Sequence, residues 1–319
     1  MSKTSLQYQL SQKGGHFAIV SIPRPTPGPN EICIRMKAVA LNPVDWKNRA
    51  MGITIQSWPT VLGHDGAGVV DSVGDSVKDF KVGDEVFALC GTDKGEGDRA
   101  AAFQEIAMVP SHYAAKKPAF LTFEEASSLG VCYLTAACAI TVGLHIPLPY
   151  IDPTGGSSVK SILVLGGSST VGGAAIQLLR LALPSATILA TSSTKHHAHL
   201  ISLGSDSKRA GFDAILDAVT AAASQPDIFS AFNPTGPKTY SQVVTGVNVE
   251  VPQGVDSTLI YAPQIFGEKG GMNAMPGLTD LLQSGKFKLP VKVEVVGKGF
   301  DAIEHGLDKL MKGVSGANF

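Results

Sequence analysis

Short runs of hydrophobic and β-branched residues dominate the first third of the chain. They are Phe17 to Ile22, Glu31 to Ala40, Gly68 to Val73 and Asp84 to Leu89. Turn-forming residues such as those from Pro25 to Asn30 separate them. Runs of this length, bounded by proline and glycine, are typical of β-strands. The pattern predicts a small β-rich barrel.

Helical patterns begin near residue 122. Thr122 followed by Glu125 predicts a capping box that opens a helix, and Tyr133 to Leu144 predicts a second, apolar helix. Strand and helix patterns then alternate through Phe212 to Val219, which favours a parallel sheet covered on both faces. The last forty residues predict a helix beginning near Thr279 and two further elements: the strand Val291 to Val296 and the helix Phe300 to Met311.

A glycine-rich corner joins the buried strand Ile162 to Leu165 to a helix that follows Gly172. Such a corner directs backbone N–H groups and a helix dipole at one point, which suits an anionic pyrophosphate. We therefore predict a dinucleotide site, whose contacts are Ser168, Ser169, Thr170 and Val171. The spacing departs from G-x-G-x-x-G, so an ordinary strand-to-helix turn is the alternative.

A second apolar run, Ala186 to Thr191, ends in two serines and a lysine. A site specific for NAD usually has an acidic residue there, which binds the ribose 2′-hydroxyl. Ser192, Ser193 and Lys195 instead suit a 2′-phosphate, so we predict NADPH as the cofactor. Alternatively, Lys195 only begins a solvated helix.

Composition narrows the class of protein. The chain has 319 residues, of which 44% are hydrophobic and 17% charged, as expected for a globular enzyme with two domains. The net charge of −1 gives no basic surface for nucleic acid or an anionic membrane. No secretory signal or long apolar span is evident, so we expect a cytoplasmic protein. The four cysteines lack C-x-x-C spacing and are expected to be buried free thiols.

Three further motifs precede the glycine corner: Ala40 to Lys47 (ALNPVDWK), Leu62 to Val70 (LGHDGAGVV) and Phe80 to Phe87 (FKVGDEVF). With the order of barrel and doubly wound sheet, the chain resembles the medium-chain dehydrogenase/reductase family along its whole length. In detail it resembles the zinc-free quinone-oxidoreductase-like branch, and within it the fungal trans-acting enoyl reductases of polyketide biosynthesis. Ile265 to Glu268 and Gly313 to Ala317 resemble that subgroup.

The resemblance implies an α/β fold with a GroES-like β-barrel catalytic domain and a doubly wound Rossmann nucleotide-binding domain. We expect the catalytic domain at residues 1–120, joined by residues 279–319, and the NADP(H)-binding domain at residues 121–278. The family has a further helix and strand where only six residues separate Gly204 from Gly211. Either the sheet is trimmed or segments are missing there and after Phe319, and we favour missing segments.

The same resemblance implies that no metal is bound. Zinc enzymes of the family have a cysteine ligand at the position of Asn42, and an amide cannot replace an anionic ligand. His64 has no cysteine partner at that position, so a structural role is the more common outcome. Only Cys90 stands where a cysteine-rich lobe would hold structural zinc.

By resemblance, the nicotinamide end of the cofactor is lined by Val44, Asp45, Trp46 and Lys47. Other cofactor contacts implied are Thr135, Val314 and Ser315. Asn42 and Lys47 are the candidate catalytic residues, because Lys47 can offer a charged hydrogen bond or relay a proton. An ion pair of Lys47 with Asp45 or with a cofactor phosphate is an equal alternative.

The substrate pocket implied by the resemblance is largely apolar, which fits an acyl chain. Its candidate residues are Ala136, Ile140, Gly143, Ala262, Pro263, Gln264, Ile265 and Phe266. Ordinary helix packing explains the first group equally well, and Phe266 is alternatively a subunit contact. Both a monomer and a homodimer are compatible with the resemblance.

Hydride delivery to an electron-poor alkene, followed by protonation, best matches a nicotinamide site without zinc. We therefore expect an NADPH-dependent enoyl reductase acting on a small-molecule or carrier-bound unsaturated acyl substrate, with a polyketide synthase as a partner in the second case. The alternatives are a quinone or enone reductase for small electrophiles and a non-reductive protein that binds NADPH.

Overall fold

The computed structural model describes residues 3–91, 97–206, 211–313 and 316–319. The chain divides into two compact units. One comprises Met1–Val131 and Val293–Phe319 and contains both chain ends, so we call it the terminal unit. The other, Cys132–Lys292, is called the central unit.

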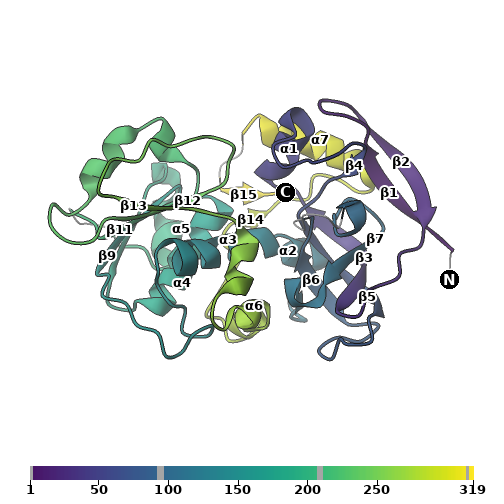
Figure 1. The fold of residues 1–319 in the computed structure, drawn as a ribbon, viewed down its shortest axis with the longest axis horizontal. Helices are drawn as coiled ribbons and strands as arrows, with labels where there is room; N and C mark the ends of the chain where they lie inside the picture. Colours follow the sequence, from purple (N-terminus) through teal and green to yellow (C-terminus); the bar gives the residue numbers. More distant parts are fainter. Residues whose placement is uncertain (1–2, 92–96, 207–210, 314–315) are drawn as a thin grey trace. The chain divides into compact units, whose positions relative to one another are not determined.

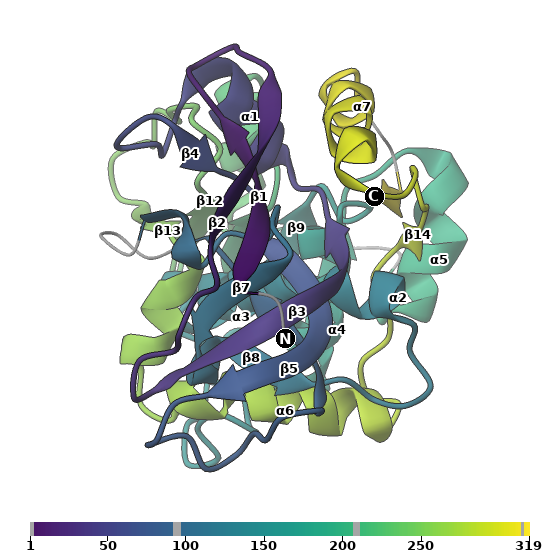
Figure 2. The same cartoon turned by 90° about the vertical axis from the view of Figure 1, so that its right-hand side faces the viewer.

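The terminal unit contains two antiparallel sheets, with strand orders β2-β1-β4 and β7-β3-β5-β6-β8. The strands are β1 Thr4–Leu10, β2 Phe17–Pro23, β3 Glu31–Ala40, β4 Thr60–Val61, β5 Asp65–Val73, β6 Glu85–Leu89, β7 Ile106–Pro110 and β8 Ala114–Lys116. Strands β3 and β5 lie side by side, from Ile32 opposite Val73 to Ala40 opposite Asp65 (Figure 2). The four strands predicted in this region are confirmed.

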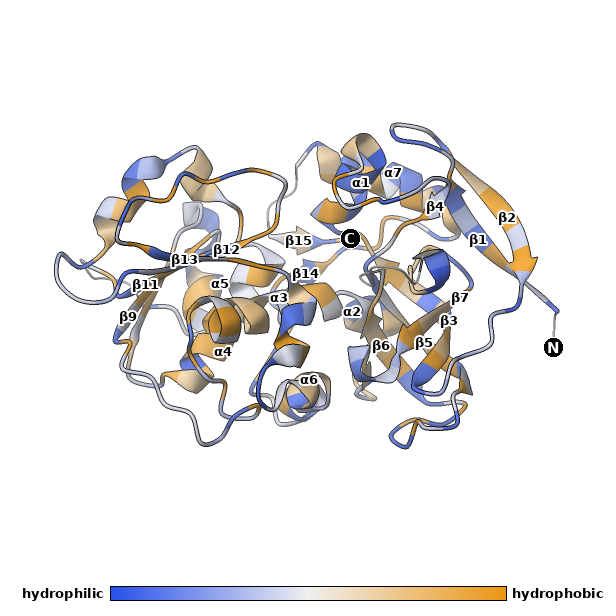
Figure 3. Cartoon of the chain, viewed as in Figure 1, coloured by the Kyte–Doolittle hydropathy of each residue, from blue (hydrophilic) through white to orange (hydrophobic). Residues whose placement is uncertain are grey.

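Hydrophobic side chains from both sheets form one core in the terminal unit. Strands β3 and β5 carry hydrophobic residues among polar ones, as half-buried strands do (Figure 3). Leu10, Ile32, Ile34 and Phe103 are fully buried in this core. The last helix, α7, adds Leu307 to the same core.

The described residues of the terminal unit also form the α-helices α1 Pro43–Met51, α2 Phe123–Ser127 and α7 Phe300–Met311. Thr122 caps α2, accepting the Glu125 N–H, as the predicted capping box requires. The Arg49 guanidinium on α1 binds Glu304 and Asp308 of α7 at 2.5 and 2.7 Å. These ion pairs connect the two helices.

The central unit is a five-stranded parallel sheet in the described residues, with the order β10-β9-β11-β12-β13. Strands β9, β11, β12 and β13 are labelled in Figure 1. Its strands are β9 Ser161–Leu165, β10 Thr187–Ala190, β11 Ala214–Asp217, β12 Thr239–Val243 and β13 Asp256–Ile260. Its helices are α4 Thr170–Ala182, α5 His197–Ser202 and α6 Ala274–Gln283, preceded by α3 Gly130–Cys138. The strand order reverses at β9, and ligands bind at such switch points.

The connection from β10 to β11 is short. The described part of the chain passes through a short 3-10 helix, Thr194–His196, and α5 without a further strand, so β10 is an edge strand with β9 as its one partner there. In the described residues the sheet therefore ends at β10 on this side of β9. Residues 207–210 of this connection lie outside the described residues.

Three expected elements differ in the structure. The helix predicted to begin near Thr279 is α6, which begins five residues earlier, at Ala274. The strand predicted over Val291 to Val296 is only β14 Lys292–Val293, because its partner β15 Ala317–Asn318 is equally short. The helix predicted from Tyr133 to Leu144 is α3 followed by a π-helical turn, Ala139–Gly143. The stretch Phe123–Gly143 is apolar and long enough to cross a membrane, but 78% of its most apolar window is buried, as in a core helix.

Candidate functional site

The corner between β9 and α4 brings backbone atoms unusually close together. Gly166 has a φ of 75°, which glycine adopts without strain. A Cβ atom at Gly172 would lie 2.3 Å from the Gly166 carbonyl oxygen and 2.8 Å from the Gly167 Cα. The helix can start this close to the strand only because position 172 has no side chain.

The N-terminus of α4 leaves hydrogen-bond donors available. Ser169 is the N-cap, and its Oγ accepts the Gly172 N–H at 3.0 Å. In the described chain, the backbone N–H groups of Ser168, Thr170 and Val171 have no hydrogen-bond partner. The first turn has no acidic residue to offset the positive end of the helix dipole. These residues therefore fit a cofactor pyrophosphate.

Ser192, Ser193 and Lys195 follow β10, which pairs in parallel with β9. Ser193 precedes a 3-10 turn, Thr194–His196, in which the Lys195 side chain is exposed. The predicted 2′-phosphate contacts thus follow β10, and β10 lies beside β9, the strand that leads into α4. Their position is compatible both with a 2′-phosphate contact and with the start of a solvated helix.

The sequence interpretation missed an apolar edge of the central sheet. Val219, Val244 and Tyr261 come just after the carboxyl ends of β11, β12 and β13, and they are 45, 43 and 37% exposed. Exposed apolar side chains at this edge suit the flat face of a nicotinamide ring. The available signal was an apolar residue one or two positions after the end of each strand, but β12 and β13 were not predicted.

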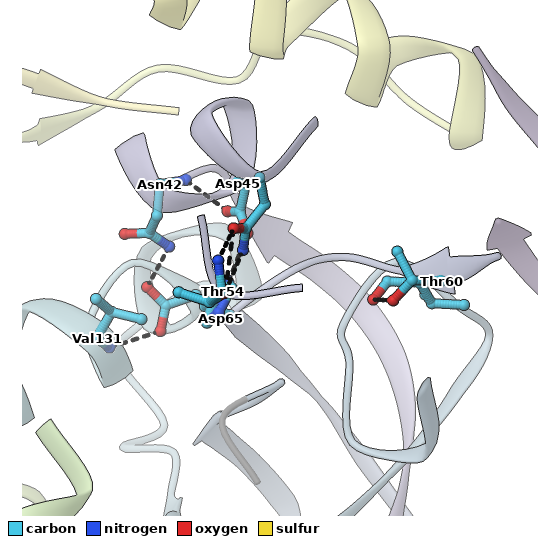
Figure 4. A network of polar contacts seen from close by, with 9 residues as sticks. Asn42, Asp45, Thr54, Thr60, Asp65 and Val131 are labelled. Carbon is cyan, nitrogen blue, oxygen red and sulfur yellow. Dashed lines mark hydrogen bonds and ion pairs between the residues drawn. The ribbon is translucent and has the colours of Figure 1, made fainter. Parts of the chain in front are cut away.

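A buried polar network surrounds the N-terminus of α1 in the terminal unit (Figure 4). Asn42 is the N-cap, and its backbone N–H donates to Asp45 Oδ2 at 2.8 Å. The other Asp45 oxygen contacts Nδ1 of His64 at 2.6 Å. Asp45 is fully buried, so these hydrogen-bond partners, rather than water, must stabilise its carboxylate.

Asp65 forms the other half of the network. Its two carboxylate oxygens accept the Asn42 Nδ2–H at 3.0 Å and the Val131 backbone N–H at 2.7 Å (Figure 4). Burial raises the pKa of Asp65 to about 7, although the two hydrogen bonds oppose that change. Sequence reasoning did not find this network, because residues that are hydrogen-bonded in it are up to 66 positions apart.

Lys47 lies on α1 two residues after Asp45, which places the two side chains on roughly opposite faces of the helix. Its Nζ lies 5.7 Å from the centroid of the Trp46 ring. Burial lowers the pKa of Lys47, which favours a lysine that can give up its proton. Val44 and Trp46 are both half-buried on the same helix.

The predicted substrate residues come together within the central unit. Ala136 and Ile140 are fully buried, while Thr135 is half-buried on α3. Ala262 to Phe266 form a 3-10 helix directly after β13, in which Ile265 is buried. The Cys138 thiol contacts the Tyr261 carbonyl oxygen at 3.4 Å, so the two segments touch.

Two of the predicted cofactor contacts, Val314 and Ser315, lie outside the described residues.

A cavity of about 440 Å³ lies in the terminal unit, lined by residues that include Val39, Val295 and Phe300 but none of the predicted site residues. In the described residues, no group of three or more histidine, cysteine, aspartate or glutamate side chains is arranged to hold a metal ion.

The chain is similar in sequence to proteins of known family. Residues 28–119 match the alcohol dehydrogenase GroES-like domain. The trans-enoyl reductase tndF of Aspergillus flavipes is 30% identical over 96% of this chain and 95% of its own length. The chain belongs to the medium-chain dehydrogenase/reductase family. Members of this family bind a nicotinamide cofactor.

Solved structures agree on the fold. An alcohol dehydrogenase superfamily protein from Novosphingobium aromaticivorans has a TM-score of 0.77 at 24% identity, covering 97% of this chain and 95% of its own. The CurK enoyl reductase has a TM-score of 0.73 at 21% identity, covering 98% of both chains. The expected α/β fold, with a GroES-like domain and a doubly wound sheet, is confirmed, as is the quinone-oxidoreductase-like branch.

Proposed function

We propose that this family member is an NADPH-dependent, metal-independent enoyl reductase. The observation that carries the proposal is the likeness to a trans-enoyl reductase over nearly the whole of both chains. The open N-terminus of α4 supports it, because a nicotinamide dinucleotide needs a site for its pyrophosphate. When bound, the reduced cofactor supplies the hydride.

The residues of the central unit account for cofactor binding in this proposal. The free N–H groups of Ser168, Thr170 and Val171 would bind the pyrophosphate, and Ser192, Ser193 and Lys195 the 2′-phosphate of NADPH. The exposed edge formed by Val219, Val244 and Tyr261 would pack against the nicotinamide ring. Thr135, Val314 and Ser315 remain predicted contacts.

The terminal unit holds the two candidate catalytic residues, Asn42 and Lys47. The Asn42 amide is held by Asp65 and is not a zinc ligand type, which favours reduction of an alkene without Lewis-acid activation. Lys47 would offer a hydrogen bond or a proton to the substrate carbonyl. Both carboxylate oxygens of Asp45 are already bound, one to His64 and one to the Asn42 N–H. In this proposal Asp45 therefore holds α1 in place and does not bind the cofactor through its side chain.

The proposed substrate is an α,β-unsaturated thioester, free or bound to a carrier. The apolar segment of Ala136, Ile140 and Gly143 would lie beside its acyl chain, with Ala262 to Phe266 on the other side. A polyketide synthase is the proposed partner for carrier-bound substrates, because relatives are named as trans-acting reductases. A cytoplasmic location is expected for such a partner.

A substrate panel tests the function. NADPH oxidation by the purified protein is measured with enoyl thioesters of several lengths, with enones and with quinones. We expect oxidation with the enoyl thioesters and a product that has gained two hydrogens. Turnover of quinones or small enones alone would contradict the enoyl reductase assignment. Consumption of no NADPH with any substrate would make the chain a non-reductive binding protein.

Metal independence has its own test. We expect no stoichiometric zinc by elemental analysis and an unchanged unfolding temperature in chelator, because Asn42 replaces the anionic ligand. One zinc per chain would contradict this part of the proposal. Chelator-resistant turnover with the enoyl thioester would support it.

A further inference from the structure

Strand β3 of the terminal unit has an open edge beyond its pairing with β7. That pairing reaches only as far as Arg35. Backbone hydrogen bonds on this edge stop at the Met36 N–H and resume just past the strand, where Leu41 donates its N–H to the Phe319 carbonyl oxygen at 2.7 Å. In between, the described chain gives residues 37–40 no strand partner other than β5. Alternate N–H and C=O groups of an antiparallel strand point away from its partner, so this edge offers unpaired backbone groups.

A second segment with unpaired backbone groups borders the same cavity. Residues 293–299 line the cavity of about 440 Å³ together with residues 36–39 of β3. Strand β14 pairs with β15, and the Glu294 N–H donates to the Asn318 carbonyl oxygen at 2.8 Å. Beyond this bond, the backbone of residues 295–297 makes no hydrogen bond within the described chain. We call the space between the two backbones the strand groove.

Strand β15 shows how a strand fits between these two backbones. At one end of the strand groove, the Asn318 carbonyl oxygen accepts the Glu294 N–H and the Phe319 carbonyl oxygen accepts the Leu41 N–H. Consecutive carbonyl groups of a strand point to opposite sides, so this short piece is bound along both edges. Phe319 also lines the cavity. The two backbones are therefore about one strand apart where the cavity begins.

The side chains that line the strand groove are largely apolar. Phe103 and Ile303 are buried, while Val39 and Phe300 are half-buried. Val295 is 61% exposed, which is unusual for a valine beside a sheet. Aliphatic side chains at every second position of an added strand would cover these residues.

Charge has little influence on which molecule fits. Of the charged side chains that line the cavity, Lys37, Lys298 and Glu124 make no ion pair among the described residues. All three are exposed, so water and salt screen them. Unpaired backbone groups and apolar side chains therefore define the occupant.

We propose that the strand groove binds a flexible, apolar segment of a partner protein as an added β-strand. Backbone hydrogen bonds to residues 37–40 and 295–297 supply affinity, and the apolar side chains supply specificity. A strand in the groove uses both of its edges, whereas the edge strand of a folded sheet has only one edge free. The occupant is therefore a linker or tail rather than a folded sheet. This proposal does not depend on the reductase function.

A synthetic peptide tests the proposal. The probe is a fluorescein-labelled peptide of seven alternating valine and threonine residues with a blocked carboxyl end, titrated with the protein and followed by fluorescence anisotropy. We expect saturable binding, and slower amide hydrogen exchange within residues 37–40 and 295–297 in the complex. The same peptide with N-methyl groups on alternate amides keeps every side chain and should bind at least tenfold more weakly. Equal binding of the two peptides, or no saturable binding at millimolar protein, would overturn the proposal.

Two substitutions locate the binding site. Val39→Trp fills the strand groove with an indole ring, and Val295→Pro removes an N–H that has no partner in the described chain. We expect each to weaken peptide binding by about tenfold. Val295→Thr keeps the N–H and the branched side chain, so this matched control should bind as the wild type does. Wild-type affinity in both variants, with unchanged unfolding temperatures, would also overturn the proposal.

Analytical ultracentrifugation distinguishes a partner protein from a second copy of this chain. We expect the wild type and Val295→Pro to have the same oligomeric state, because the groove is filled by a different protein. Self-association that Val295→Pro abolishes would assign the groove to a second copy and overturn the assignment to a partner.

Discussion

Helices α1 and α4 both begin at a polar cap residue, yet their N-termini differ in charge and in free hydrogen-bond donors. At α1, Pro43 has no N–H, Asp45 stands in the first turn, and the Asn42 N–H is bound by the Asp45 carboxylate. At α4, no acid is present and three N–H groups remain unbound in the described chain. One helix end is satisfied from within, and the other can bind an anion.

The difference shows how a helix N-terminus that has only a structural role can be distinguished from one that can bind a ligand. A capping box with an acid in the first turn completes its own hydrogen bonds, so it indicates structure. A serine cap followed by small residues, without an acid, leaves the positive end of the dipole uncompensated. Substitutions can disrupt the open N-terminus of α4, disrupt the closed N-terminus of α1, or alter residues beside them.

The largest effect is expected from Gly172→Val, which destroys the open end. Its Cβ would lie 2.3 Å from the Gly166 oxygen, so the strand and helix must separate. We expect NADPH binding to weaken by about 100-fold or more and the central unit to lose several kcal/mol of stability. Fluorescence titration and thermal unfolding measure the two. Gly156→Val, where no atom lies within 4 Å, is the control. Wild-type affinity in Gly172→Val would contradict the pyrophosphate site proposed at this corner.

Asp65→Asn tests the closed end through pH. The pKa of Asp65 is raised to about 7 from 3.8, so the folded protein holds a proton that the unfolded chain releases. Stability from this group is therefore complete at acid pH and is lost as pH rises toward 7, by about 1.4 kcal/mol per pH unit. The variant should lose this slope. Trp46 and Trp58, both in the terminal unit, report its unfolding in urea. Equal slopes in both proteins would refute the assignment to Asp65.

Thr170→Asp converts the open end into the closed type. An acid in the first turn should stabilise α4 by about 0.3–1 kcal/mol. The same charge should repel a pyrophosphate and weaken NADPH and NADH alike, by about tenfold or more. Thr170→Asn is the uncharged control. Tight binding of either cofactor to the Asp variant would mean that the pyrophosphate binds elsewhere.

Lys195→Ala should weaken NADPH binding by about tenfold, because a charge-assisted hydrogen bond contributes roughly 1.5–3 kcal/mol. NADH should barely respond, since it has no 2′-phosphate. The measurement is a pair of fluorescence titrations on each protein. If wild type binds both cofactors equally, or if the substitution weakens both alike, Lys195 is only a surface charge.

The smallest effect is expected from Lys47→Ala, which should slow turnover without abolishing it, because orientation in a dry site supplies much of the rate. Steady-state kinetics with an enoyl thioester measure this. An unchanged kcat/KM would remove Lys47 from the mechanism.

Local patterns were sufficient for much of the fold. β3 and α7 have the predicted bounds, and Thr122 caps α2 as its sequence indicates. β1 was missed because buried glutamine at Gln7 interrupts its apolar pattern, and β13 because most of its residues are exposed. In both strands, pairing with neighbours outweighs the local signal.

The candidate site also has one part that local sequence predicts and one part that depends on long-range contacts. The nucleotide corner is a continuous stretch, so its residues could be predicted from the sequence alone. The network of Asn42, Asp45, His64 and Asp65 depends on contacts between separate elements, and no spacing rule predicts them. Asp45 was predicted as a cofactor contact and His64 as a structural residue, but their hydrogen bond to each other was not anticipated.

The edge position of β10 has a consequence for how cofactor preference can change. In the described sheet β10 has one neighbour, β9, and Ser192, Ser193 and Lys195 come after its last paired residue, Ala190. Exchanging these three side chains removes no interstrand hydrogen bond. If these residues bind the 2′-phosphate as proposed, substitutions in this one surface turn would change the preference between phosphorylated and unphosphorylated coenzymes with little cost to folding.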